Sequence, residues 1–212
     1  MTILWTEPVI NGAAILSYTV YILESDELSY SLELSYCDGS LSSIVNALQC
    51  TIPVAVLKAA PFNLPWGTNV HAKLYATNIQ GDSIMSNPGS GAIITTNPDP
   101  PIDLVENYSL RTPTTLGLTW TKAPFIGGAV IDDYRVSFAV LGGSFSVLVS
   151  GLLTPDYKAV DLTSGVIYQF KVQSRNSYDY SSYSETITLL CAFKPEAPAA
   201  PVTSRTTNQA VI

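Results

Sequence analysis

Hydrophobic and polar residues alternate along several segments of the chain, and a period of two is typical of half-buried β-strands. In the segment VIYQFKVQSRN, this alternation places Tyr168, Phe170 and Val172 on one face and polar residues on the other. Residues 70–74 repeat the pattern and leave His71, the only histidine, on the outward face. Gly, Pro and Asn turns separate such segments at short intervals, so we expect an antiparallel β-sandwich.

The chain also contains an internal repeat, the sequence signature of two similar domains. The segment LWTEPVINGAAILSYTV, which begins at Leu4, matches TWTKAPFIGGAVIDDYRV, which begins at Thr119. Each copy contains a Trp, then a Pro, a turn and a Tyr, at nearly equal spacing. Downstream, VHAKLYATNIQGDSIMS matches YQFKVQSRNSYDYSSYS. We therefore predict one domain at residues 1–97 and a second at residues 98–194.

The two copies differ in length between these matching blocks. The segment from Tyr18 to Asn78 in the first copy is clearly longer than the equivalent segment from Tyr134 to Asn176 in the second. The first domain therefore carries an insertion, which we place around residues 37–66.

The insertion holds two of the three cysteines. Cys37 and Cys50 lie on either side of a predicted turn, a spacing that allows a disulfide across a hairpin. Closing a loop of this size contributes about 3 kcal/mol and implies an oxidising compartment. Two reduced, half-buried thiols are the alternative. We expect Cys191, the remaining cysteine, to be a small buried residue.

As a set, the motifs W-x-x-P or W-x-x-x-P, GG-x-x-I-x-x-Y-x-V and G-x-x-Y-x-F-x-V-x-x-x-N resemble the fibronectin type III domain, present twice in tandem. The resemblance implies an all-β fold of two immunoglobulin-like sandwiches, with Trp120 in strand B, Tyr134 in strand C and Tyr168 as the tyrosine corner. The first copy has Val70 in place of that tyrosine, so we expect the insertion and its disulfide to hold the corner. This copy is also loosely similar to repeats of large surface proteins of single-celled eukaryotes.

The two ends of the chain complement each other. A full strand separates Trp120 from Pro101, in the linker NPDPPIDL, whereas Trp5 lies almost at the start of the chain, so the first domain lacks its own strand A. Residues 195–212 resemble the linker and strand A of the second domain, with Pro201 in the place of Pro101. The segment after Pro201, joined to the segment that precedes Trp5, would have nearly the length found between Pro101 and Trp120.

We expect residues 195–212 to supply a strand A. The recipient is the next domain of a covalently continuous array or, by donor-strand complementation, the first domain of another molecule. Both interpretations describe a head-to-tail array of this chain with itself. The assembly strand is predicted at Pro201, Val202, Thr203, Asn208, Ala210, Val211 and Ile212. Its acceptor is predicted within residues 1–5, at Ile3 and Trp5.

Composition narrows the possible function classes. Hydrophobic residues make up 47% of the chain and charged residues 13%, which favours a β-rich protein. The net charge of −7 argues against nucleic acid as a partner. No apolar run approaches the roughly 20 residues that span a bilayer. Together with the predicted disulfide, these features favour an extracellular or cell-surface protein.

Residues with catalytic or metal-binding potential form no recognisable constellation. No nucleophile or acid is positioned with His71, and the glycine pairs at 127–128 and 142–143 are typical of turns between strands. The carboxylate clusters at residues 24–27 and 132–133 lack the spacing of a calcium loop. We therefore expect no catalytic residue, no metal site and no cofactor.

The remaining motifs favour a structural or adhesive role. Asn107 lies in the triplet Asn-Tyr-Ser, a glycosylation sequon. Our first hypothesis is a structural repeat unit of a fibre. The alternative is an adhesion or receptor fragment that binds a protein or glycan through loops at residues 9–12, 125–128 and 177–183.

Overall fold

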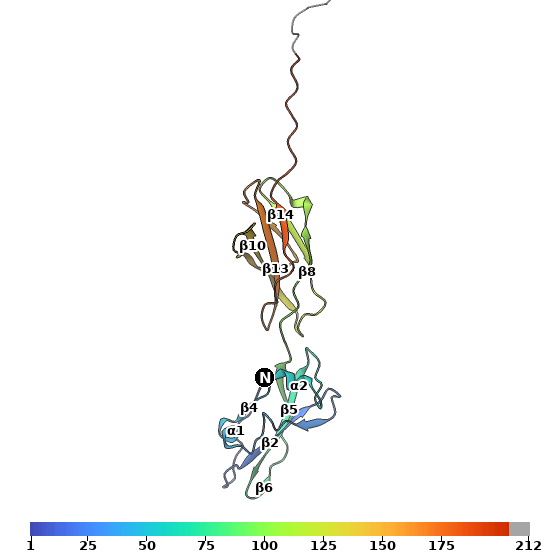
Figure 1. Cartoon of the computed structure of the whole chain (residues 1–212). Helices are drawn as coiled ribbons and strands as arrows, with labels where there is room; N and C mark the ends of the chain where they lie inside the picture. Colours follow the sequence, from blue (N-terminus) through green and yellow to red (C-terminus); the bar gives the residue numbers. More distant parts are fainter. Residues whose placement is uncertain (204–212) are drawn as a thin grey trace, which may run out of the picture.

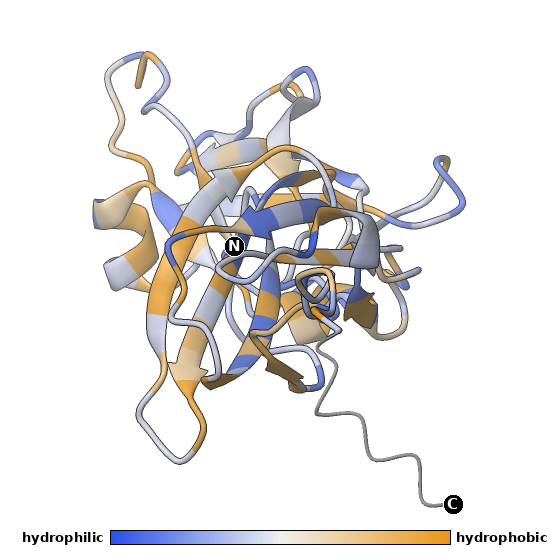
Figure 2. Cartoon of the chain, turned by 90° about the horizontal axis from the view of Figure 1, so that it is seen from above, coloured by the Kyte–Doolittle hydropathy of each residue, from blue (hydrophilic) through white to orange (hydrophobic). Residues whose placement is uncertain are grey.

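The computed structural model describes residues 1–203, which form two β-sandwich domains arranged end to end (Figure 1). The N-terminus lies near the junction of the domains, and the segment after the last strand runs outward from the far end of the second domain. Hydrophobic and hydrophilic residues alternate along the strands (Figure 2), so that each sheet has one apolar face. The predicted fold class, two tandem all-β sandwiches, is confirmed.

The second domain consists of a sheet of three strands packed on a sheet of four. The first sheet has the order β12-β9-β8 and the second the order β11-β10-β13-β14. The three-stranded sheet comprises β8 (Ile102–Glu106), β9 (Leu116–Thr121) and β12 (Asp156–Ala159). The four-stranded sheet comprises β10 (Ile131–Val140), β11 (Ser146–Leu152), β13 (Ile167–Asn176) and β14 (Ile187–Leu190). A 3-10 turn, η1 (Tyr108–Leu110), connects β8 to β9.

The core of the second domain is arranged as the resemblance implied. Trp120 on β9 packs against Tyr134 on β10 with ring centroids 5.5 Å apart. The inward face predicted for β13 is confirmed. The hydroxyl of Tyr168 accepts a hydrogen bond of 3.0 Å from the backbone N–H of Thr163, which is the predicted tyrosine corner.

One residue of β13 departs from the alternation. Gln173 belongs to the polar, outward face of the strand, yet it is only 6% exposed. The guanidinium of Arg135 donates to its Oε1 at 2.6 Å, and its Nε2 donates to the carbonyl of Ser181 at 2.7 Å. Arg135 in turn lies 3.8 Å from the centroid of the Tyr180 ring. This polar layer on the outer face of the sheet buries Gln173.

The first domain has the same plan, with a difference at one edge. Its larger sheet has the order β3-β2-β5-β6, with β7 also paired to β5. The strands of this sheet are β2 (Ser17–Leu23), β3 (Tyr30–Leu32), β5 (Asn69–Asn78), β6 (Gly81–Asp82) and β7 (Gly89–Ile93). The second sheet contains β1 (Thr2–Leu4) and β4 (Gln49–Thr51). These two strands match β9 and β12, and β8 has no counterpart among the described residues of this domain.

The insertion folds into two short helices that complete the core of the first domain. They are α1 (Ser42–Ala47) and α2 (Val54–Lys58), one on each side of β4 in the sequence. Leu57, Phe62 and Leu64 from this region are buried in the same cluster as Val70, the residue that replaces the corner tyrosine. Sequence alternation gave no signal for these helices because each spans fewer than two turns.

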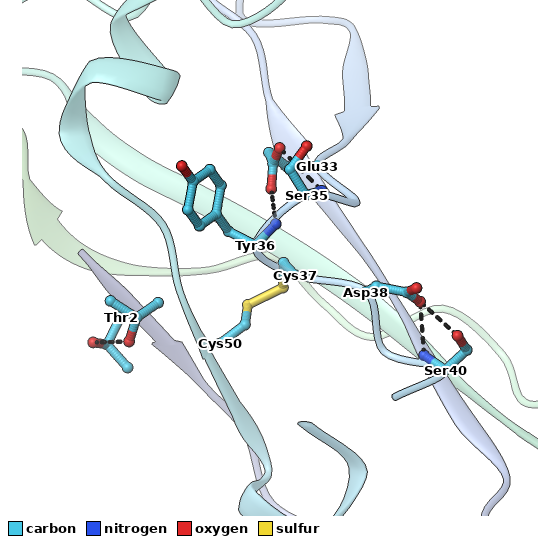
Figure 3. The surroundings of a disulfide bond; sticks show 9 residues. Thr2, Glu33, Ser35, Tyr36, Cys37, Asp38, Ser40 and Cys50 are labelled. Atoms are coloured by element: carbon cyan, nitrogen blue, oxygen red, sulfur yellow. Dashed lines mark hydrogen bonds between the residues drawn. A yellow bond between two sulfur atoms is a disulfide. The ribbon is translucent and has the colours of Figure 1, made fainter. Parts of the chain in front are cut away.

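A disulfide fastens the insertion to the sheet. Cys37 and Cys50 are bonded, both are buried, and Cys50 lies on β4 (Figure 3). Two carboxylates order the loop that carries Cys37: Glu33 accepts from the backbone N–H of Tyr36 at 2.7 Å, and Asp38 accepts from that of Ser40 at 3.0 Å. The covalent bond therefore anchors the edge strand pair β1–β4 through β4.

Candidate functional site

A groove runs along β1 on the side away from β4. It has a volume of about 750 Å³ and lies between β1 and the residues that lead from β6 into β7. Its apolar wall comes from the inward face of β5, namely Val70, Ala72, Leu74 and Ala76, which also belong to or flank the core of the first domain. The groove is therefore an open side of the hydrophobic core.

The backbone of β1 is hydrogen-bonded on one edge only. Ile3 is paired with Cys50 of β4, and the N–H of Trp5 donates to the carbonyl of Leu48 at 3.0 Å. In an antiparallel strand, successive residues direct their N–H and C=O groups to opposite edges. The backbone groups of Thr2 and Leu4 consequently face the groove, and Leu4 is 73% exposed. Such an edge is a template for pairing with another strand.

The second domain shows how the same edge is used when a third strand is present. The N–H of Trp120 donates to the carbonyl of Pro155 at 3.0 Å, as the N–H of Trp5 donates to the carbonyl of Leu48. The two bonds are equivalent, so β1 can be aligned residue by residue with β9. With this register, Leu4 corresponds to Thr119, which pairs with Val105 of β8. The groove of the first domain therefore occupies the place that β8 fills in the second.

Two residues that line the groove, Trp5 and Tyr18, carry buried polar atoms. The hydroxyl of Tyr18 and the indole N–H of Trp5 have no hydrogen-bond partner among the described residues. The Tyr18 side chain is only 2% exposed, and the two rings pack with centroids 5.2 Å apart. Burial, with a contribution from the Glu7 carboxylate, raises the pKa of Tyr18 above its ordinary value.

The predicted acceptor residues, Ile3 and Trp5, lie at this groove. Ile3 and Trp5 both line it, but their backbones are paired with β4. Thr2 and Leu4, which lie within the predicted acceptor segment, supply the free edge. The register of β1 against β4 determines which residues have their backbone groups paired with β4, here Ile3 and Trp5, and which have them at the open edge, here Thr2 and Leu4. No signal in the sequence gives that register.

The predicted donor segment is described only at its beginning. Residues 201–203 are exposed, with Val202 at 93%, and they form no strand. The other predicted donor residues, Asn208 and residues 210–212, lie outside the described residues.

A second feature is the joint between the domains, where residues 95–99 pass along the loop at residues 125–128. The backbone N–H groups of Thr96 and Asp99 donate to carbonyls of that loop, at 2.9 and 3.1 Å. Asn176, which is buried, donates through Nδ2 to the carbonyl of Thr96 at 2.8 Å, and Asn97 donates to the carbonyl of Tyr180 at 2.6 Å. The joint is therefore a hydrogen-bonded interface and not a free linker.

The joint also requires glycine. A Cβ on Gly127 would lie 2.1 Å from the carbonyl oxygen of Thr96, and a Cβ on Gly128 would lie 2.6 Å from the backbone nitrogen of Gly67. Both glycines have positive φ angles, 71° and 82°. Their sequence interpretation as turn residues is correct but incomplete, because their second partner belongs to the other domain.

The remaining candidate residues do not converge on a site. Asn107 caps η1 through its Oδ1, which accepts from the backbone N–H of Ser109 at 3.3 Å and from the Ser109 hydroxyl at 2.6 Å. Asp133 forms an ion pair with Arg175 on the neighbouring strand. Within residues 1–203, no group of three or more His, Cys, Asp and Glu side chains is arranged to hold a metal ion. None of the helices in the described part of the chain has the length and apolar character needed to cross a membrane.

The fold and groove define a tandem β-sandwich protein of the immunoglobulin-like class. Residues 103–189 match the family model of the fibronectin type III domain, which confirms the resemblance for the second domain. The chain is similar in structure to a crystal structure of titin domains A168-A170, with a TM-score of 0.58 and 15% identity. The similarity covers 84% of this chain and 55% of the titin chain, which supports the two-domain fold.

Two curated proteins are similar in sequence. One is "Fibronectin type-III domain-containing protein 3A" of Pongo abelii, 29% identical over 79% of this chain and 14% of the relative. The other is "Protein sidekick-1" of Gallus gallus, 29% identical over 68% of this chain and 7% of the relative. The chain thus spans a small part of the length of either relative.

Proposed function

We propose that this chain is a structural repeat unit of an extracellular or cell-surface fibre, assembled head to tail when an extended strand fills the groove beside β1. The observation that carries the proposal is the open groove in the position of β8. It presents free backbone groups of Thr2 and Leu4 above an apolar wall, which is the recognition surface that strand addition requires.

The second domain supplies the template for the bound strand. β8 runs antiparallel to β9 and places Val105 opposite Thr119, while the neighbouring Leu104 packs against the core. A strand in the groove accordingly runs antiparallel to β1, with one residue opposite Leu4 and an adjacent apolar side chain directed toward Val70.

Residues 201–212 of a second molecule are the donor that we propose. Their sequence, PVTSRTTNQAVI, combines β-branched and apolar residues with polar ones and contains a single charged side chain. The exposed segment that leads to them leaves the far end of the second domain, away from the first domain (Figure 1), whereas the groove belongs to the first domain, which favours donation to another copy. A head-to-tail contact of this kind generates an extended array. The equivalent strand of a covalently continuous repeat would fill the groove in the same way.

An oxidising compartment fits the structure of the first domain. The Cys37–Cys50 disulfide is buried and secures β4, the strand that pairs with β1. Disulfides of this structural type persist in extracellular environments. We propose Asn107 as a glycosylation site on the same ground.

Ligand capture by the sandwich loops is the alternative function. The loop at residues 125–128 is engaged in the joint, whereas Tyr178 and Tyr183 remain exposed on the second domain. Substitution of these two tyrosines by Ser distinguishes the functions, because it abolishes capture of a protein or glycan ligand but leaves self-association unchanged.

The test compares the full chain with a version ending at Lys194 by light scattering and negative-stain electron microscopy. The described sheets are complete before Lys194, since β14 ends at Leu190, so the shorter chain is expected to fold. We expect head-to-tail assemblies of the full chain and their loss on truncation. Addition of a synthetic peptide of residues 199–212 should restore occupancy of the groove and raise the melting temperature of the first domain.

A matched pair of variants tests the groove itself. Leu4→Pro removes an N–H that faces the groove but keeps the bonds of Ile3 and Trp5 to β4, because proline is tolerated at an open edge. We expect Leu4→Pro to abolish peptide binding and Leu4→Ala to retain it. Equal peptide binding by both variants, or no peptide binding by the unmodified short chain, contradicts strand addition at this groove.

A further inference from the structure

The joint between the two domains has a counterpart at the opposite end of the first domain. The loop at residues 9–12 corresponds to the loop at residues 125–128 in the internal repeat. Asn11 and Gly12 have φ angles of 49° and 89°, and Gly127 and Gly128 have 71° and 82°, so the two loops share a backbone conformation. This end of the first domain thus presents the same loop that the second domain uses to hold its neighbour.

The asparagine that closes the joint is also duplicated. Asn176 donates through Nδ2 to two carbonyls, that of Ile126 in its own loop at 2.9 Å and that of Thr96 across the joint at 2.8 Å. Asn78 occupies the same place in the first domain and is 3.4 Å from the carbonyl of Ile10. Its other carbonyl neighbour within the described chain, Ala13, is 3.5 Å away. These long contacts leave the Asn78 amide able to donate to an incoming backbone carbonyl.

We propose that this end of the first domain, comprising residues 9–12, Asn78 and β6, docks against the C-terminal end of the second domain in another copy of the chain. The inference rests on the proposed head-to-tail assembly and names a second contact within it. A donor strand that enters the groove from another copy must first pass the loop at residues 9–12, because the groove is lined by Thr6 and Pro8 at that end.

The second domain ends with the backbone pattern that the joint requires. The N–H of Gly165 donates to the carbonyl of Cys191 at 2.7 Å, as that of Gly67 donates to Ile94 at 2.9 Å. The N–H of Cys191 donates in turn to Val166, as that of Ile94 donates to Thr68, both at 2.9 Å. Cys191 and Ile94 are therefore equivalent.

Counting from these two residues identifies the groups that would meet at the new contact. Phe193 takes the place of Thr96 and Lys194 the place of Asn97, and a proline follows in both copies. The segment from this proline to Pro201 is three residues longer than the segment from Pro98 to Pro101. The bonds that Thr96 forms at the joint use its backbone N–H and C=O, so a different side chain at this position still allows them.

The side chains on the two surfaces are complementary in polarity and charge. Val9 and Ile79 are 85% and 74% exposed on the first domain, and Phe193 offers an exposed apolar side chain from the other copy. At the existing joint, Asn97 donates through Nδ2 to the backbone carbonyl of Tyr180. In the repeat, Lys194 takes the place of Asn97 and Asp82 the place of Tyr180, so the Lys194 ammonium would approach the backbone of Asp82 and lie near its carboxylate.

The proposed contact between copies differs from the joint within the chain at one loop position, which is Asn11 in the first domain and Gly127 in the second. Asn11 carries a Cβ at the position of Gly127, where a Cβ would lie 2.1 Å from the carbonyl oxygen of Thr96. The docked segment must therefore sit farther from residue 11 than residue 96 sits from Gly127. We expect the contact between copies to be weaker than the joint within a chain, and Asn11→Gly to strengthen it.

The test measures self-association of the full chain by sedimentation velocity, beside binding of the peptide of residues 199–212 to the chain ending at Lys194. We expect Asp82→Lys to weaken self-association by about tenfold, or about 1.4 kcal/mol. The compensating pair Asp82→Lys with Lys194→Asp should recover the loss, and Asn11→Gly should strengthen association. The peptide lacks Lys194, so its affinity for the chain ending at Lys194 should change little in any of the three variants.

The outcomes separate this inference from the function on which it rests. If the peptide binds and the full chain associates equally well in the unmodified form and in all three variants, the docking contact is wrong and strand addition stands. If the double charge reversal associates no better than Asp82→Lys, the pairing of Lys194 with Asp82 is wrong. Absence of both peptide binding and self-association overturns the proposed function and the docking contact together.

Discussion

The glycines of the two equivalent loops provide a matched measurement of the joint. Gly12 and Gly128 have nearly the same φ angle, 89° and 82°, so replacement by Ala imposes the same backbone strain, about 1–2 kcal/mol. Only at Gly128 does the added Cβ meet another domain, at 2.6 Å from the nitrogen of Gly67 and 2.8 Å from the carbonyl oxygen of Ile94. At Gly12 no atom of the described chain lies within 4 Å.

The extra cost of Gly128→Ala follows from the hydrogen bonds that hold the joint. Three of them link residues 96–97 of the first domain to the second domain: one from the backbone N–H of Thr96, one from Asn176 and one from the side chain of Asn97. If the added methyl group forces the domains apart, all three are lost. At about 1 kcal/mol net for each bond, the loss is about 3 kcal/mol beyond the strain that both variants share.

Calorimetry and small-angle X-ray scattering of dilute, monomeric chains test this difference. We expect Gly12→Ala to lower only the melting temperature of the first domain, by about 5–15 °C, and to leave the scattering curve unchanged. Gly128→Ala should lower stability further and broaden the distribution of interdomain distances. Equal stability losses and identical scattering curves for the two variants would refute the reasoning that the joint depends on contact at Gly128.

Three further predictions concern the interior of each domain. Tyr168→Phe removes the hydrogen bond that its hydroxyl accepts at the corner and should destabilise the second domain by about 1–2 kcal/mol in urea unfolding, with the first domain as internal control. Replacement of Cys37 and Cys50 by Ser should cost the first domain about 3 kcal/mol, and a reductant should reproduce the effect in the unmodified chain only. Burial raises the pKa of Tyr18 above 10.0, so its contribution is present below pH 10 and is lost as the pH rises above that value. A melting-temperature profile that is equally steep above pH 10 in Tyr18→Phe would contradict the last prediction.

The sandwich fold was accessible from the sequence because its determinants are local and repeated. The period of two in β13, the Trp–Tyr pair of each copy and the tyrosine at position 168 each follow from one short segment. The structure confirms the corner bond of Tyr168 and the packing of Trp120 on Tyr134. The helices α1 and α2 were not predicted, since they are short and are stabilised by burial of Leu57 and its neighbours in the core.

The candidate site was only partly accessible, because its geometry depends on strand register. The sequence indicates that strand A is missing beside the first tryptophan, and the groove lies there. It does not indicate whether Ile3 and Trp5 or Thr2 and Leu4 present the open edge. A shift of one residue exchanges the two sets, and the pairing of Ile3 with Cys50 decides the matter.

In tandem domains, the residue type that a loop position requires can depend on the neighbouring domain, and position 127 is an example. Within either domain, residues 11 and 127 occupy the same left-handed turn position, which both Asn and Gly adopt readily. The requirement for Gly at 127 arises from the carbonyl of Thr96 in the preceding domain, which leaves no space for a Cβ. In the proposed array, Asn11 would therefore keep a docked neighbour farther away than Thr96 lies from Gly127. If successive contacts of the array differ in this way, flexibility is expected to concentrate between copies, and each pair of domains to move as one rigid unit.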